Sequence, residues 1–158
     1  MSQLIIIMGV SGSGKTTVGQ SLAQELNLSF FDADDFHSAS NKEKMSSGIP
    51  LTDQDRIPWL ETLHNLCSSY KEKGLVLACS ALKHSYRVLL SENLTIEWVY
   101  LKGSFELIYS RMHARTTHFM PPNLLQNQFD ILEEPTDAYT VSINQSVESI
   151  VSALVHHI

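Results

Sequence analysis

A run of nine residues near the start of the chain, GVSGSGKTT at residues 9–17, has the composition and spacing of a loop that binds a polyphosphate. It follows the pattern G-x-x-x-x-G-K-T, in which glycines allow backbone N–H groups to point at anionic oxygens. The helix behind such a loop directs the positive end of its dipole at the same anion. We expect Lys15 to reach the β- and γ-phosphate oxygens, and the hydroxyl of Thr16 to ligate the Mg²⁺ that bridges them. On its own this motif is typical of motors, switches and phosphotransferases alike.

Polar side chains that could act on a phosphate acceptor follow two other apolar runs. DADDFH, at residues 32–37, brings three carboxylates and an imidazole, and SALKHSYR, at residues 80–87, brings a lysine and an arginine. Arg111 and Arg115 lie four positions apart, which places both on one face of a helix. If the apolar runs are parallel strands, these groups converge at the carboxyl edge of the sheet, where ligands of such folds bind.

The elements expected to position these residues are short strands that alternate with helices. Five short apolar runs predict the strands, at residues 4–8, 29–32, 75–79, 96–101 and 140–143. Helices are expected after the phosphate loop, at residues 58–74, 86–90 and 105–115, and at the end of the chain. Pro58 is expected to occupy the first position of its helix. This alternation predicts an α/β fold with a parallel sheet that is covered by helices on both faces.

Composition narrows the class of protein. The 158 residues fit one domain, and a hydrophobic content of 43% is enough for a sizeable core. A formal net charge of −6 argues against general binding to nucleic acid or to anionic membranes, which needs an excess of lysine and arginine. No apolar run approaches the ~18 residues of a membrane-spanning helix, so we expect a cytoplasmic protein. Cys67 and Cys79 lack metal-ligand spacing and are expected to be small buried thiols.

Two classes of phosphate-loop protein fit poorly. A GTPase switch would carry D-x-x-G, yet no aspartate here has glycine three positions later. In addition, NKEK at residues 41–44 places lysine where the aspartate that reads guanine would stand. A motor ATPase usually needs a larger chain and an apolar strand that ends in an acidic pair, whereas the third predicted strand ends in Cys79. A small-molecule kinase fits best, with the acceptor bound after the second strand.

Longer motifs resemble those of the gluconokinase family from the first strand to the last helix. Besides the phosphate loop they are DADDFH (32–37), NKEKMSSGIPLTDQDRIPWL (41–60), CSALKHSYR (79–87), YLKGSFELIYSRMHAR (100–115) and HFMPPNLLQNQFDILEEP (118–135). The resemblance implies ATP-dependent phosphorylation of D-gluconate to 6-phospho-D-gluconate by a homodimer. It also implies the P-loop kinase fold, with a parallel sheet of strand order 2-3-1-4-5 and a mobile lid at about residues 116–122. Two positions depart from the usual family pattern, Ala33 where glycine is common and Asn127 where serine is common.

On the nucleotide side, the resemblance implies roles for the whole loop and for two arginines. Asp32 would hold Mg²⁺ through water beside Thr16. Arg111 would stack on adenine, although it could instead be a plain surface arginine, and Arg115 would neutralise charge in the transition state. The loop residues expected to bind ATP are Gly9, Val10, Ser11, Gly12, Ser13, Gly14, Lys15, Thr16 and Thr17.

On the acceptor side, Asp34 would orient the primary hydroxyl of gluconate and take its proton, by similarity to the D-x-D motif of related kinases. His37 could hydrogen-bond a sugar hydroxyl or serve in packing, and Gln128 would help to close the sugar site. The acceptor also carries a carboxylate, which requires cations farther out. Three residues could bind it or the polyol, although each could form a structural ion pair instead: Arg56, which the resemblance places best, Lys83 and Arg87.

Two alternatives to a gluconokinase stay open. One is another small-acceptor kinase of the same fold, such as a kinase for shikimate. The other, from a different class, is a non-catalytic nucleotide-binding module. The joint presence of the loop lysine and threonine, both acceptor-side aspartates and Arg115 argues against the module. Release of ADP in the presence of different acceptors would discriminate among the three.

Overall fold

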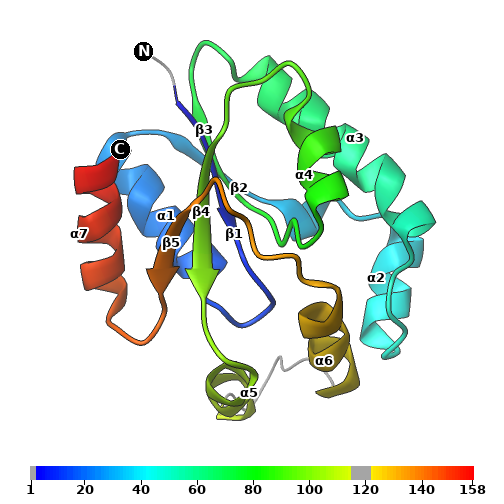
Figure 1. The fold of residues 1–158 in the computed structure, drawn as a ribbon. Helices are drawn as coiled ribbons and strands as arrows, with labels where there is room; N and C mark the ends of the chain where they lie inside the picture. The colour runs from blue at the N-terminus through cyan, green and yellow to red at the C-terminus, as the bar shows by residue number, and fades with distance from the viewer. Residues whose placement is uncertain (1–2, 115–121) are drawn as a thin grey trace.

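The computed structural model describes residues 3–114 and 122–158, in which five parallel strands form a single sheet between layers of helices (Figure 1). The strand order is β2-β3-β1-β4-β5. The strands are β1 (Leu4–Met8), β2 (Ser29–Asp32), β3 (Leu75–Ala78), β4 (Glu97–Lys102) and β5 (Tyr139–Ser142). The predicted fold class and strand order are confirmed, and each strand begins and ends within one residue of its predicted bounds.

The central strand, β1, separates two hydrophobic clusters. Ile5 and Ile7 point into one cluster, while Leu4, Ile6 and Met8 point into the other. All five side chains are buried, which explains why this strand is a continuous apolar run rather than an alternating one.

Helices cover both faces of the sheet and extend beyond its carboxyl edge. They are α1 (Lys15–Leu26), α2 (Ala39–Ser46), α3 (Asp53–Ser69), α4 (His84–Ser91), α5 (Phe105–His113), α6 (Pro122–Ile131) and α7 (Val147–His157), with a 3-10 turn, η1 (Ala33–Phe36), after β2. α1 and α7 pack on one face, and α3 and α4 pack on the other (Figure 1). α5 and α6 lie beyond the carboxyl ends of β4 and β5 (Figure 1).

α3 begins earlier than the sequence suggested. It starts at Asp53 and ends at Ser69, so the prediction that Pro58 opens this helix was wrong. Thr52 and Asp55 form a capping box, in which the Asp55 N–H donates to Thr52 Oγ1 at 3.1 Å and the Thr52 N–H donates to Asp55 Oδ2 at 2.9 Å. This cap satisfies the donors at the helix start, whereas Pro58 removes one hydrogen bond from the helix interior.

Two other helices, α2 and α6, were not expected from the sequence. α2 is capped by Ser38, whose Oγ accepts from the Asn41 N–H at 3.1 Å.

The helix expected at residues 105–115 is observed as far as His113. Arg115 and residues 116–121 of the expected lid lie outside the described residues.

Both cysteines are buried between the sheet and α3, and neither forms a disulfide. Burial raises the pKa of the Cys67 thiol to about 12, and burial also raises the pKa of the Cys79 thiol. The expectation of small buried thiols is confirmed.

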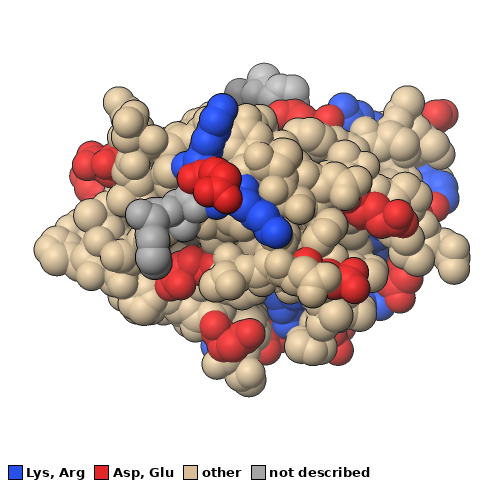
Figure 2. All heavy atoms as spheres, turned by 90° about the horizontal axis from the view of Figure 1, so that it is seen from above, with Lys and Arg blue, Asp and Glu red and all other residues tan. Residues whose placement is uncertain are grey.

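Charged side chains are interspersed on the face at the amino ends of the strands. Figure 2 views this face and shows acidic and basic groups side by side rather than a broad patch of one sign. Among the described helices, none has both the length and the apolar character needed to cross a membrane.

Candidate active site

The phosphate loop connects β1 to α1 and requires glycine at two close approaches. Gly12 has a φ of 80°, and a Cβ there would lie 2.7 Å from the Sδ atom of Met112 in α5. A Cβ on Gly9 would lie 2.9 Å from the carbonyl oxygen of Leu101 in β4. The loop is therefore held tightly against β4 and α5, and α1 begins directly behind it at Lys15.

Lys15 lies half-buried over the loop. Its Nζ donates to the carbonyl oxygen of Val10 at 3.0 Å. Desolvation lowers the pKa of Lys15, and the carboxylates of Asp34 and Asp32 oppose that shift. The cation thus lies between the loop and the acidic residues at the end of β2 and in η1.

Thr16 and Asp32 bring two oxygens together at the mouth of the site. The Thr16 hydroxyl donates to Asp32 Oδ2 at 2.8 Å, and Asp32 Oδ1 accepts from the Asp34 N–H at 3.0 Å. The first bond joins α1 to the end of β2, and the second caps η1. A hydroxyl and a carboxylate beside a phosphate loop are oxygen ligands of the kind that Mg²⁺ prefers.

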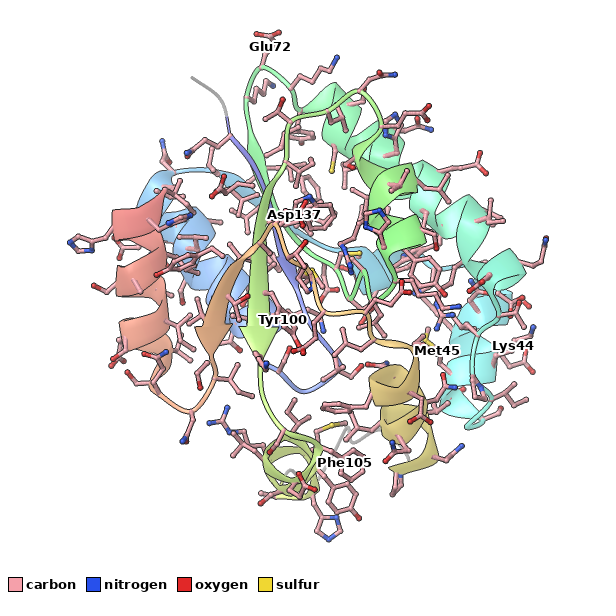
Figure 3. The ribbon with its side chains drawn as sticks, in the orientation of Figure 1. Lys44, Met45, Glu72, Tyr100, Phe105 and Asp137 are labelled. Atoms are coloured by element: carbon pink, nitrogen blue, oxygen red, sulfur yellow. The ribbon has the colours of Figure 1, made fainter. Side chains whose placement is uncertain are left out.

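A cavity of ≈ 80 Å³ brings most of the predicted acceptor residues together. Asp34 is exposed at its mouth, yet protein atoms crowd it and the resulting desolvation raises its pKa, while Lys15 opposes the shift. Met45 enters from the side of α2 that faces α6 (Figure 3). The lining residues are Ser11, Lys15, Asp34, His37, Met45, Leu51, Arg56, Trp59, Ser80, Leu82 and Gln128.

His37 is buried in the wall of this cavity and is neutral. Its ring stacks on Trp59, with ring centroids 4.1 Å apart, and the Trp59 Nε1–H donates to the Ala33 carbonyl at 2.7 Å. Burial, together with the nearby Arg56 and Lys42 cations, lowers the pKa of His37 to about 4.

The tautomer of His37 follows from a neighbouring amide. Asn41 Nδ2 donates to the Asp55 carbonyl at 2.9 Å and lies 3.3 Å from His37 Nδ1. Because the carbonyl can only accept, the donor side of the Asn41 amide is fixed, and Nδ1 must accept from it. The ring proton is therefore on Nε2, which remains a donor.

Arg56 is the predicted cation that the structure brings into the cavity wall. Its Nη1 donates to the Leu51 carbonyl at 2.8 Å and to the Tyr86 hydroxyl at 3.0 Å. The guanidinium carbon lies 5.3 Å from the centroid of the Tyr86 ring.

Lys83 and Arg87 do not line the cavity. Lys83 Nζ pairs with Asp53 at 3.0 Å. Arg87 is buried, and it donates to the Ala81 carbonyl at 2.6 Å and to the Glu133 carbonyl at 2.9 Å. Those contacts fasten the segment after β3 to the segment after α6, which is a structural role.

Gln128 lines the cavity from α6 and contacts the phosphate loop. The Ser11 N–H donates to Gln128 Oε1 at 2.7 Å, and Gln128 Nε2 donates to Ser11 Oγ at 3.1 Å. The side-chain amide thus joins α6 to a loop residue that was expected to bind nucleotide.

Among the other residues expected on the nucleotide side, the structure describes Arg111 and Ser13. Arg111 is exposed near the end of α5, and its Nη2 donates to the Ile143 carbonyl after β5 at 2.8 Å. Ser13 is buried, and its Oγ has no hydrogen-bond partner among the described residues. Arg115 lies outside the described residues, so its role stays a prediction.

Sequence reasoning missed several contributors to the site. Trp59 is buried in the core, and it also lines the cavity and stacks on His37. Tyr86 and Asp53 were not singled out. Tyr86 lies three residues after Lys83, and Asp53 lies three residues before Arg56. This spacing from two predicted cations was the signal that could have identified them.

A larger hollow shares no lining residue with the cavity beside the phosphate loop. It has a volume of ≈ 450 Å³ between α1 and α7 and is lined by Gln24, Glu25, Glu148 and neighbouring residues, without a lysine or arginine. The smaller cavity beside the phosphate loop is therefore the better candidate for binding a phosphate and its acceptor, because it is lined by two cations and a carboxylate.

Comparisons with known proteins agree with the fold and the loop. The family model for shikimate kinase matches residues 11–154. A probable gluconokinase from Mus musculus is 47% identical over 96% of this chain and 95% of that protein. The thermoresistant gluconokinase of Escherichia coli is 42% identical over 96% and 91%, respectively. The crystal structure of a gluconokinase from Sinorhizobium meliloti is 42% identical, with a TM-score of 0.88 over 95% of this chain and 87% of that one.

These relatives align with this chain over nearly its whole length, and the solved structure shares its fold. The chain belongs to the gluconokinase family of P-loop kinases.

Proposed function

We propose that this chain transfers the γ-phosphate of ATP to the primary hydroxyl of D-gluconate and releases 6-phospho-D-gluconate. Relatives named gluconokinase in animals and bacteria align along almost the entire chain, which supports this activity. The observation that carries the proposal is that Lys15, Asp34 and Arg56 line the same cavity. It offers one cation for the phosphate, one carboxylate for the hydroxyl and a second cation for the acceptor carboxylate.

Asp34 is suited to orient the acceptor hydroxyl and to accept its proton. Desolvation raises its pKa, which makes the ionised carboxylate a stronger base. Lys15 opposes that shift and favours the ionised form that the reaction needs. The two residues therefore act on opposite ends of the same transfer, with the lysine on the phosphate and the aspartate on the hydroxyl.

Lys15 must exchange its partner when ATP binds. In the structure its ammonium group donates to the Val10 carbonyl, and a phosphate oxygen is a stronger, charged acceptor for the same proton. The negative charge that spreads over the transferred phosphoryl group is then stabilised by a cation already in position.

Thr16 and Asp32 are the residues proposed to hold Mg²⁺. Their oxygens lie 2.8 Å apart beside the loop, and both are hard ligands. Mg²⁺ would supply neutralisation of the phosphate oxygens. The Thr16 hydroxyl can keep donating its proton to Asp32 while its lone pairs face an ion.

His37, Arg56 and Gln128 are proposed to recognise the rest of the acceptor. The neutral His37 ring retains an Nε2–H donor for a sugar hydroxyl, as its contact with Asn41 requires. Arg56 provides the cation that matches the acceptor carboxylate. Gln128 lines the same cavity and closes it from α6.

The family resemblance also supports a single-domain homodimer in the cytoplasm, with a lid near residues 116–122 that carries Arg115 toward the phosphates. Arg111 would then contact adenine from α5. Sedimentation velocity would test the dimer, and amide exchange with and without ATP and gluconate would test the lid.

The activity is tested by ADP release with a panel of acceptors, namely D-gluconate, shikimate, D-glucitol and nucleoside monophosphates. We expect turnover to be fastest with gluconate and ³¹P NMR to place the phosphate on the primary oxygen. Faster turnover with shikimate would favour the other small-acceptor kinase. Tight binding of ATP without transfer to any acceptor would favour a non-catalytic module.

A further inference from the structure

Four side chains form a continuous chain of contacts from the surface to the cavity wall. Lys83 Nζ donates to Asp53 Oδ1 and Oδ2 at 3.0 and 3.2 Å. The Tyr86 hydroxyl donates to Asp53 Oδ1 at 2.5 Å. Arg56 Nη1 donates to the same hydroxyl at 3.0 Å. The first helix turn of α3, the loop after β3 and α4 all contribute to this chain.

The direction of each hydrogen bond is fixed by chemistry. Arginine can only donate, so the Tyr86 oxygen must accept from Arg56, and the single phenolic proton must go to Asp53. Burial and the contact with Asp53 raise the pKa of Tyr86 to about 12. The phenol therefore stays protonated and keeps one lone pair directed at Arg56 throughout the neutral pH range.

These contacts fix one end of the Arg56 guanidinium and leave the other available. Both N–H groups of Nη1 are committed, one to the Leu51 carbonyl and one to the Tyr86 hydroxyl. Within residues 3–114 and 122–158, neither Nη2 nor Nε of Arg56 donates to another group. These two atoms form the edge with which arginine binds a carboxylate through two parallel bonds.

The neutral phenol also keeps the charge of Arg56 available. An aspartate in direct contact with Arg56 would compete with the acceptor carboxylate for the same N–H groups. Here Asp53 contacts Arg56 only through Tyr86, and the ammonium group of Lys83 pairs with the Asp53 carboxylate. The cluster of two cations and one anion therefore retains one positive charge, on the residue that lines the cavity.

We propose that Tyr86, held by Asp53 and Lys83, is a positioning residue that aims the guanidinium of Arg56 at the carboxylate of the acceptor. The proposal rests on the proposed function, because it assigns a recognition role to the same cavity. Tyr86 does not contact the acceptor itself, and it acts through Arg56 alone.

The test is the substitution Tyr86→Phe, which removes the hydroxyl and keeps the buried ring. We expect the KM for gluconate to rise about tenfold, because the loss of one hydrogen bond to a charged group weakens binding by about this factor. The kcat and the KM for ATP should change less than about twofold, because neither involves the freed end of Arg56. The preference for gluconate over D-glucitol should narrow by the same factor, since the neutral polyol has no carboxylate.

Tyr100→Phe is a matched control. The Tyr100 hydroxyl also donates to a carboxylate, Glu134 Oε2 at 2.9 Å, and Lys102 pairs with that carboxylate at 3.1 Å. Tyr100 lies on β4 and does not line the cavity (Figure 3). If loss of a buried phenol simply loosened the fold, Tyr100→Phe would raise the KM for gluconate as Tyr86→Phe does, and that result would overturn the proposal.

A double-mutant cycle isolates the route through Arg56. In an Arg56→Ala background, Tyr86→Phe should leave the KM for gluconate unchanged, because the group that it positions is gone. An undiminished tenfold effect in that background would contradict the positioning role of Tyr86.

The identity of the acceptor is tested separately from the role of Tyr86. If the parent enzyme prefers another acid in the acceptor panel, the same cycle is run with that acid. A parent enzyme that prefers no carboxylate over its neutral analogue would also overturn the proposal.

Discussion

His37 makes the stability of this protein sensitive to mild acid. Its pKa falls from 6.5 to about 4 in the folded chain, because the ring is buried and because Arg56 and Lys42 disfavour a further positive charge. The unfolded chain therefore binds a proton first, so the contribution of His37 is fully present above about pH 6.5 and is lost as the pH falls toward about 4. For one site with these pKa values, the free energy of unfolding drops by about 2 kcal/mol between about pH 7 and about pH 5.

The assay compares urea unfolding of the parent protein and of His37→Gln at both pH values. The variant cannot titrate at this position, so its loss of stability on acidification should be smaller by about 2 kcal/mol. The comparison cancels the other titrating groups, which both proteins share. Equal losses in the two proteins, or an NMR titration that places the pKa of His37 near its ordinary value, would refute the reasoning.

Three further predictions concern the reaction and the loop. Lys15→Ala should lower kcat at least ~100-fold, a loss of about 3 kcal/mol of transition-state stabilisation, without a change in Tm, and near-normal turnover would contradict the assignment of the loop. Asp34→Asn should abolish most of kcat while calorimetry still detects ATP binding, and retention of kcat would exclude Asp34 as the base. Gln128→Ala should speed amide exchange at Ser11 in the enzyme without ligands, because that N–H donates to the Gln128 side chain, and equal protection would argue against this contact.

The sheet and the phosphate loop could be predicted because their determinants are local. The run at Leu4–Met8 is apolar without alternation, as a strand buried on both faces must be, and the loop motif contains its own glycines. The convergence of Lys15 and Asp34 in one cavity also followed from the sequence, because the carboxyl ends of parallel strands share one edge of the sheet.

The start of α3 and the existence of α2 were harder to predict. Thr52 and Asp55 form a capping box with the usual spacing, but Pro58 is also a common first residue of a helix, and the sequence alone did not rank the two signals. α2 is mostly polar, so it lacks the apolar periodicity by which helices are detected. Its contacts with α3 include the Lys44 to Asp55 ion pair at 3.0 Å.

The roles of the basic residues depended on partners far away in the sequence. Arg87 donates to the Glu133 carbonyl, which lies 46 positions along the chain, and Lys83 pairs with Asp53, which lies 30 positions back. Neither distance leaves a pattern in the sequence, so the family resemblance favoured Arg56 but residue spacing could not decide among the three candidate cations. The fold places Arg56 alone of the three in the cavity wall.

The burial of both native thiols makes this protein convenient to label. A maleimide reacts with an exposed thiolate, and Cys67 and Cys79 are both buried with raised pKa values. A cysteine introduced at Ser46 of α2, together with another at Gln126 of α6, would therefore take up fluorophores selectively, since both positions are exposed. Energy transfer between the two dyes would then report, in the otherwise unaltered chain, whether the distance between α2 and α6 changes as the acceptor fills the cavity.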